Sequence, residues 1–90
     1  MRPDPCFVYV LGTVGLDDRS KMRTYVGWSN DLDQRISKHN KGTGAKSTRG
    51  RQWQLLYAEI FFSRGAAMSR EWYLKRDKNF RRALLKNWIS

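Results

Sequence analysis

CFVYVL, at residues 6–11, is a short run of apolar, β-branched and aromatic side chains, and such runs are typical of buried strands. A second run of this kind, TYVGW at residues 24–28, follows a segment at 12–23 whose glycine and alternating charges indicate a surface loop. Two strands joined by one loop pair most simply as antiparallel neighbours. We therefore expect the fold to begin with an antiparallel strand pair.

A helix is expected directly after this pair. Ser29 or Asn30 offers an N-cap, because short polar side chains accept hydrogen bonds from the first helical N–H groups. Leu32 and Ile36 are four residues apart and should anchor one face of the helix to the sheet. Gly42 marks its end, and a basic, glycine-rich loop at 42–51 follows.

One further strand and two helices complete the chain. Residues 53–62, WQLLYAEIFF, predict the third strand, and Ser63 can cap a helix that continues to residue 74. The last helix, after Asp77, is expected to bury Phe80, Leu84, Leu85 and Trp88. The order β-β-α-β-α-α predicts a single α+β domain over residues 1–90, with a three-stranded, mainly antiparallel sheet flanked by helices.

The chain is strongly and unevenly basic. Eighteen basic and eight acidic residues give a formal net charge of +10. Residues 1–33 hold four basic and five acidic residues, a net of −1, whereas residues 34–90 hold fourteen and three, a net of +11. Such a field attracts phosphate polyanions. A solvated basic surface that only aids solubility is the alternative.

Membrane and secreted classes are disfavoured. No apolar run approaches the roughly 20 residues of a membrane span, and no helix combines a wide apolar face with a lysine face. The N-terminus lacks a charged-then-apolar secretory signal. Cys6 is the single cysteine and cannot form an internal disulfide, so a reduced, cytoplasmic compartment is the expectation.

Three residues on the predicted helices carry polar groups suited to phosphate chemistry. Arg35 and His39 are four residues apart and project from one helix face, where an arginine can neutralise charge on a phosphate. Glu71 is one of only three acids after position 34 and can bind a hard cation such as Mg²⁺. The alternatives are a solvated arginine beside a locally bonded histidine, and a surface ion pair of Glu71 with Arg70 or Lys75.

Tyrosines and a basic loop are weaker signals. Tyr9 and Tyr25 lie mid-strand, where most tyrosines belong to the core. If both hydroxyls emerge at one sheet edge, they can orient water or carry a proton. Lys46, in the segment GAKSTRGR at 44–51, is expected to contact phosphate, although the segment lacks the spacing of a Walker P-loop.

Together these segments resemble the GIY-YIG nuclease superfamily, and in particular its small single-domain members of the YhbQ-like, UPF0213 type. The resemblance covers the chain from about Phe7 to Leu85. It is carried by FVY at 7–9, YVG at 25–27, SNDLDQR at 29–35, HNKG with GAK at 39–46, and REW at 70–72. The first triplet begins with phenylalanine where the family name has glycine, and Trp28 stands where many relatives have lysine.

The resemblance implies the same sheet and helices, and the hydrolysis of a DNA phosphodiester with one divalent ion, Mg²⁺ or Mn²⁺. Carried over, Glu71 would hold the metal and Tyr9 would be the general base for the attacking water. Tyr25 would position the water or the phosphate. Arg35 would stabilise the charge of the transition state, and His39 would orient a phosphate or assist proton transfer.

Further residues are implied in supporting roles. Gly27 would allow a close approach where a side chain would intrude, and Asn30 would order the turn into the helix. DNA would be held by basic side chains. These are Lys46, Arg49, Arg51, Arg70 and Lys75.

The resulting prediction is a metal-dependent DNA endonuclease of weak or structure-selective specificity, acting on branched, nicked or single-stranded DNA in repair or recombination. Specificity domains are attached to many relatives, and none is expected here, so a protein partner that supplies specificity stays open. Two alternatives remain: a nucleic-acid-binding module without turnover, and a subunit that gives a larger partner its nuclease centre.

Overall fold

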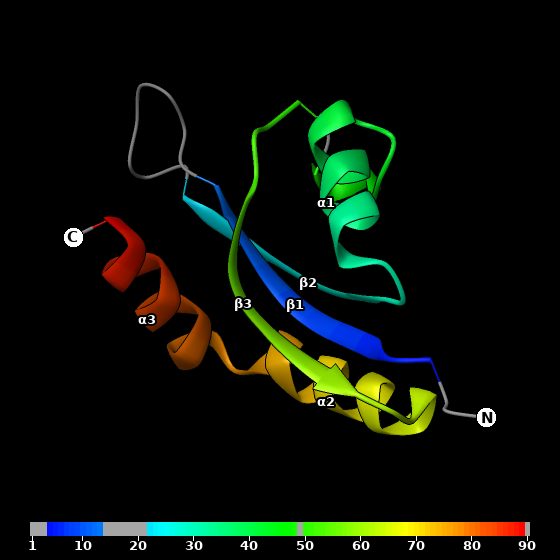
Figure 1. Ribbon diagram of the computed structural model, residues 1–90. Helices are drawn as coiled ribbons and strands as arrows, with labels where there is room; N and C mark the ends of the chain where they lie inside the picture. Colours follow the sequence, from blue (N-terminus) through cyan, green and yellow to red (C-terminus); the bar gives the residue numbers. More distant parts are fainter. Residues whose placement is uncertain (1–3, 14–21, 49, 90) are drawn as a thin grey trace.

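β1 (Cys6–Thr13) is the central strand of a three-stranded sheet. It pairs antiparallel with β2 (Arg23–Ser29) on one side and with β3 (Gln54–Phe61) on the other, so the strand order is β2-β1-β3. Figure 1 shows this sheet in the computed structural model, which describes residues 4–13, 22–48 and 50–89. The predicted element order and antiparallel sheet are confirmed, and β1 and β2 reach about one or two residues beyond their predicted ends.

β1 is buried on both of its faces because layers of side chains cover the sheet on either side. Successive side chains of a strand point to opposite faces. Cys6, Val8 and Val10 join a core cluster with Val26, Ala67 and Leu74. Tyr9 and Leu11 join a second cluster with Trp53. Burial on both faces explains why residues 6–11 form a nearly continuous apolar run instead of an alternating one.

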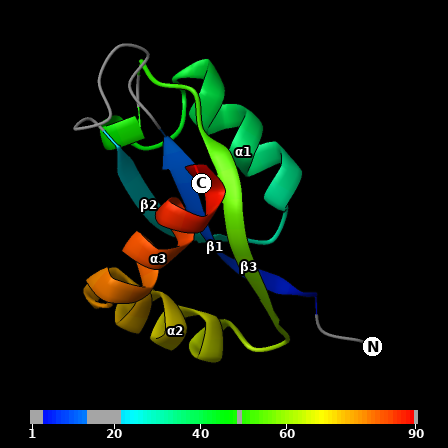
Figure 2. The ribbon, with the colours of Figure 1, turned by 90° about the vertical axis from the view of Figure 1, so that its left-hand side faces the viewer.

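The helices divide between these two faces. α1 (Leu32–Lys41) packs on the Tyr9 face through Leu32 and Ile36, as predicted. α2 (Arg64–Arg76) and α3 (Lys78–Ile89) cover the opposite face. The sheet therefore lies between α1 and the α2–α3 pair in Figures 1 and 2. None of the helices in the described ranges is long and apolar enough to cross a membrane.

The N-cap of α1 is Asp31, two residues after Ser29 and one after Asn30, the two predicted positions. Asp31 is in an extended conformation, and its carboxylate accepts a hydrogen bond of 3.0 Å from the Gln34 N–H. Ser29 instead bonds the backbone of Asp31, and the Asn30 amide lies 3.8 Å from the Cys6 thiol. The predicted end is confirmed, since Gly42 adopts a left-handed φ of 79° and closes the last turn.

Two further expectations concern Trp88 of α3 and the two predicted loops. Trp88 was expected in the core, but its side chain is 39 % exposed, because α3 packs against the core through Phe80 and Leu84 and not through Trp88. The basic loop contains a single 3-10 turn at Lys46–Thr48. Residues 14–21 of the predicted loop between the first two strands lie outside the described residues.

The corrected N-cap makes a testable prediction. Asp31→Ala should lower the free energy of unfolding by about 1 kcal/mol, because one orphan N–H of α1 loses its partner. In a domain of this size that corresponds to a fall in Tm of roughly 4–8 °C. Asn30→Ala is the matched control and should shift Tm much less. Equal shifts in thermal unfolding for the two variants would contradict the assignment.

Candidate active site

A buried chain of hydrogen bonds links β1, α1 and the loop that follows α1. The Tyr9 hydroxyl lies 2.9 Å from His39 Nε2, and His39 Nδ1 lies 2.9 Å from Thr48 Oγ1. Thr48 donates its own hydroxyl hydrogen to the Ala45 carbonyl over 2.8 Å, so it accepts from His39. His39 therefore carries its proton on Nδ1, and Nε2 accepts the hydrogen bond from Tyr9.

The loop around Thr48 is fastened to α1 and to the start of β3. Asn40 donates to the Trp53 carbonyl over 3.2 Å and accepts from the Trp53 N–H over 2.6 Å. The Trp53 indole N–H donates to the Thr48 carbonyl. A Cβ at Gly44 would lie 2.7 Å from His39 Nδ1, so the loop requires a glycine to pack on the imidazole.

Sequence reasoning missed these positioning residues. In the sequence, Asn40 and Thr48 are polar residues close to His39, and their spacing does not indicate which group each of them would bond. Their hydrogen bonds connect residues nine to thirteen positions apart across the loop.

Tyr9 is enclosed by β2 and the aromatic rings around it. Gly27 is its register partner, and a Cβ there would lie 2.5 Å from the Tyr9 hydroxyl oxygen. The Tyr25 ring lies 6.3 Å from that of Tyr9 and 4.7 Å from that of His39, between centroids. The Tyr9 side chain is 0 % exposed, so the condition that both hydroxyls emerge at one sheet edge is not met for Tyr9. Tyr25 is only partly buried.

Burial sets the protonation of this pair. It raises the pKa of Tyr9 to about 12, with further increases from Tyr25 and Glu71, while the Arg35 guanidinium opposes the shift. Burial also lowers the pKa of His39, and the positive charge of Arg35 lowers it further. At neutral pH the pair is thus a neutral phenol that donates to a neutral imidazole.

Arg35 carries an unsatisfied donor beside these two residues. Within the described residues its Nε is buried and has no hydrogen-bond partner. The residue borders a hollow of about 280 Å³ that Trp28, Ser29 and Asn30 also line. A buried guanidinium N–H without a partner costs free energy unless a ligand satisfies it. The arrangement therefore suits an anionic oxygen.

Glu71 belongs to α2, and its negative charge is one of the causes that raise the pKa of Tyr9. Lys75 Nζ lies 3.5 Å from its carboxylate, so one of the ordinary ion pairs considered for this residue is present. The part of the chain that the structure describes contains no cluster of three His, Cys, Asp or Glu side chains.

Among the described residues, this site offers few donors to a metal ion. Both nitrogens of His39 are engaged, and Glu71 is a carboxylate that could serve as a protein ligand. A single carboxylate fits Mg²⁺ or a similar hard cation, which keeps several waters and takes substrate phosphate oxygens as its other ligands.

The basic residues predicted to hold DNA are in different situations. Lys46 is exposed in the loop after α1, and Arg51 is partly buried. Arg70 forms an ion pair of 2.6 Å with Glu59, and Lys75 is paired with Glu71, so neither is a free cation. Arg49 lies outside the described residues.

Comparison with known proteins identifies relatives along nearly the whole chain. A UPF0213 protein of Clostridium perfringens is 51 % identical over 53 residues, which are 58 % of this chain and 57 % of that protein. One from Haloquadratum walsbyi is 48 % identical over 52 residues, 57 % of this chain and 58 % of that protein. One from Streptococcus pyogenes is 42 % identical over 79 residues, 87 % of this chain and 79 % of that protein.

The chain thus spans a little over half the length of the first two relatives. No solved structure matches it. The family model described as the GIY-YIG catalytic domain matches residues 6–83, which include Tyr9, Arg35, His39 and Glu71. The chain therefore belongs to the GIY-YIG catalytic-domain family, as a small protein of the UPF0213 type.

Proposed function

We propose that this domain is a divalent-metal-dependent endonuclease that hydrolyses DNA phosphodiester bonds. Membership of the GIY-YIG family points to an endonuclease with DNA as substrate. One observation in the structure supports the proposal most directly: Tyr9 donates its hydroxyl hydrogen to a neutral His39 beside the unsatisfied donor of Arg35. A proton acceptor is thereby placed next to a phosphate-binding group.

Tyr9 and His39 together can act as the general base. With a pKa of about 12, Tyr9 is not ionised at neutral pH and cannot be a base by itself. It can take a proton from the attacking water while its own proton passes to His39 Nε2, 2.9 Å away. Thr48 accepts from His39 Nδ1 and holds the imidazole in the tautomer that this transfer requires.

The remaining site residues act on charge and orientation. Arg35 would donate to non-bridging phosphate oxygens, where charge grows in the transition state. Glu71 would hold one Mg²⁺ or Mn²⁺, which supplies Lewis-acid stabilisation to the phosphate and the departing oxygen. Tyr25, partly buried between Tyr9 and Trp53, would orient the water or the phosphate.

The proposal extends to the biological substrate. A domain that binds DNA mainly through phosphate contacts distinguishes between DNA shapes better than between DNA sequences. We therefore propose weakly specific or structure-selective cleavage of branched, nicked or single-stranded DNA in repair or recombination, with a protein partner as a further source of specificity.

A nucleic-acid-binding module without turnover is the second candidate function. It is favoured by the complete burial of Tyr9 and by the ion pair between Glu71 and Lys75. Catalysis requires water to reach the hydroxyl and requires the carboxylate to exchange its lysine for a metal ion. Binding alone requires neither change.

Removing the metal ligand separates these two functions. Glu71→Gln should abolish cleavage of supercoiled plasmid and branched oligonucleotides, with DNA affinity kept or raised because one negative charge is removed. Glu59→Gln removes the same charge from an ion pair with Arg70 and should keep cleavage. Both variants are assayed in Mg²⁺, Mn²⁺ and EDTA. Substantial cleavage by Glu71→Gln would contradict the one-metal mechanism, and a wild-type protein that binds without cutting would favour the second candidate.

The unsatisfied guanidinium predicts a kinetic effect. Arg35→Ala should lower kcat by about 10²–10³-fold, the usual loss when one donor to a transition-state oxyanion is removed, with a smaller change in KM. Arg35→Lys should recover only part of the rate, because an ammonium group does not reproduce the forked geometry. A variant in which KM rises and kcat is unchanged would assign Arg35 to substrate binding alone.

The lowered pKa of His39 predicts the direction in which activity changes with pH. Its pKa is below the usual 6.5, so kcat/KM should be level above pH 6.5 and fall as the pH drops through the folded pKa, where Nε2 becomes protonated. The contribution of neutral His39 to the free energy of unfolding should also be lost as the pH falls. Rates from about pH 5 to 8 test this, and His39→Gln should remove that acid limb. An unchanged limb in the variant would exclude His39 as its source.

A further inference from the structure

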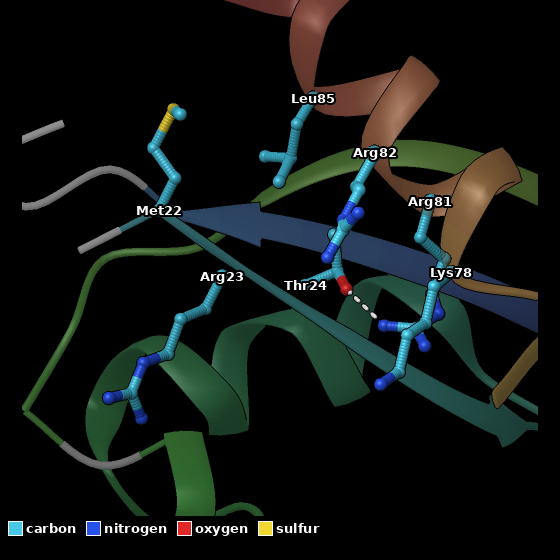
Figure 3. A pocket seen from close by; sticks show the side chains of 7 residues that line it. All are labelled: Met22, Arg23, Thr24, Lys78, Arg81, Arg82 and Leu85. Carbon is cyan, nitrogen blue, oxygen red and sulfur yellow. Dashed lines mark hydrogen bonds between the residues drawn. The ribbon is translucent and has the colours of Figure 1, made fainter. Parts of the chain in front are cut away.

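A second basic cleft lies between the start of β2 and α3, away from the Tyr9–His39 pair. Its volume is about 330 Å³, and of the seven described residues that line it four are cations and none is an acid. Figure 3 shows the seven side chains: Met22, Arg23, Thr24, Lys78, Arg81, Arg82 and Leu85.

Arg81 gives this cleft a fixed positive charge. Its guanidinium donates to the Leu74 and Lys75 carbonyls over 3.0 and 2.8 Å, which satisfies two carbonyls at the end of α2. It also donates to the Thr24 hydroxyl over 2.8 Å, the hydrogen bond drawn in Figure 3. All three acceptors are neutral, so the side chain is held in place and has no acidic partner among the described residues.

Three more cations surround Arg81 without acidic partners. Arg23, Lys78 and Arg82 are exposed, and among the described residues none of them takes part in an ion pair. In Figure 3, Arg23 extends on one side of the β2 ribbon and the α3 side chains lie on the other. The cleft therefore opens across the outer edge of β2, which is the edge strand of the sheet.

We propose that this cleft binds a phosphate group of the nucleic-acid backbone, as a second point of attachment for the strand that the active site cuts; the inference rests on the proposed function. β2 joins the two sites, because the cleft adjoins Thr24 and the Arg35 hollow adjoins Trp28 and Ser29. Five strand residues span roughly 16 Å. That length corresponds to about five nucleotide steps along a DNA duplex.

An extended polyanion fits this arrangement better than a small one. The cations come from two elements, Arg23 from β2 and the other three from α3, so they are distributed to both sides of the β2 ribbon instead of being gathered on one element. Several successive phosphates can contact such a distribution, and their binding depends on salt through counterion release. The cleft thereby fixes which part of the nucleic acid reaches Arg35, without touching the reacting phosphate itself.

The test compares a variant that lacks two positive charges of the cleft with a control variant that lacks two positive charges of α1. The cleft variant is Lys78→Gln with Arg82→Gln, which leaves Arg81 and its structural hydrogen bonds intact. The control is Lys38→Gln with Lys41→Gln, two exposed lysines of α1 outside the cleft. Both pairs are built on Glu71→Gln, and binding to a labelled 20-base-pair duplex is followed by anisotropy in EDTA across about 50–200 mM salt. Thermal unfolding confirms that both proteins are folded.

The expected result is a flatter salt dependence for the cleft variant alone. The slope of log K against log[salt] should fall in magnitude by about one to two, since each phosphate that the protein no longer neutralises removes about 0.9 from it. The control should keep nearly the parent slope. Equal slopes in the two variants would overturn the proposal. So would NMR shifts of the cleft residues with inorganic phosphate together with an unchanged DNA slope, because the cleft would then hold a lone anion.

The two double variants are also assayed for DNA cleavage in the protein that keeps Glu71. This assay separates the inference about the cleft from the proposed nuclease function. A flatter slope for the cleft variant, with no cleavage by the wild type, would reject the nuclease and keep the cleft as a backbone-binding site. Cleavage by the wild type, with equal slopes for the two variants, would keep the nuclease and reject the cleft. If both hold, the cleft variant should show a raised KM with kcat largely retained.

Discussion

The hydrogen bond from Tyr9 to His39 is the interaction on which the rest of the site depends. It joins the central strand to α1, and it is complete only because Thr48 fixes the tautomer of the imidazole. Gly27 and Gly44 leave room for the two rings where any Cβ would collide with them. Several distant positions of the chain are thus constrained by one buried hydrogen bond.

The cationic side chains of the domain are neutralised to different extents. Arg35 keeps a buried donor unsatisfied, while Arg70 is neutralised by Glu59. At the far end of β2, Arg81 is held by neutral acceptors only. The net charge of +10 thereby includes positive charge fixed at two places along one strand, instead of being evenly spread over the surface.

The sheet explains how groups from different elements meet. α1 and the α2–α3 pair cover opposite faces, so His39 and Glu71 come from opposite sides of the strands. β2 is an edge strand, and both hollows lie along it. A central strand is flanked by a neighbour on each side, whereas an edge strand is flanked on one side only, which leaves room for hollows along its other edge.

The sequence by itself determined the order of the elements, the antiparallel strands and the anchoring of α1 by Leu32 and Ile36, because these depend on local periodicity and burial. It also singled out Tyr9, Arg35, His39 and Glu71. Only the tertiary structure decided that Tyr9 is enclosed, that Asp31 caps α1, that Asn40 and Thr48 position the site, and that Arg23 and Arg82 line one cleft. Hydrogen bonds such as that of Arg81 with Thr24 join residues 57 positions apart, and no local pattern encodes such a pairing.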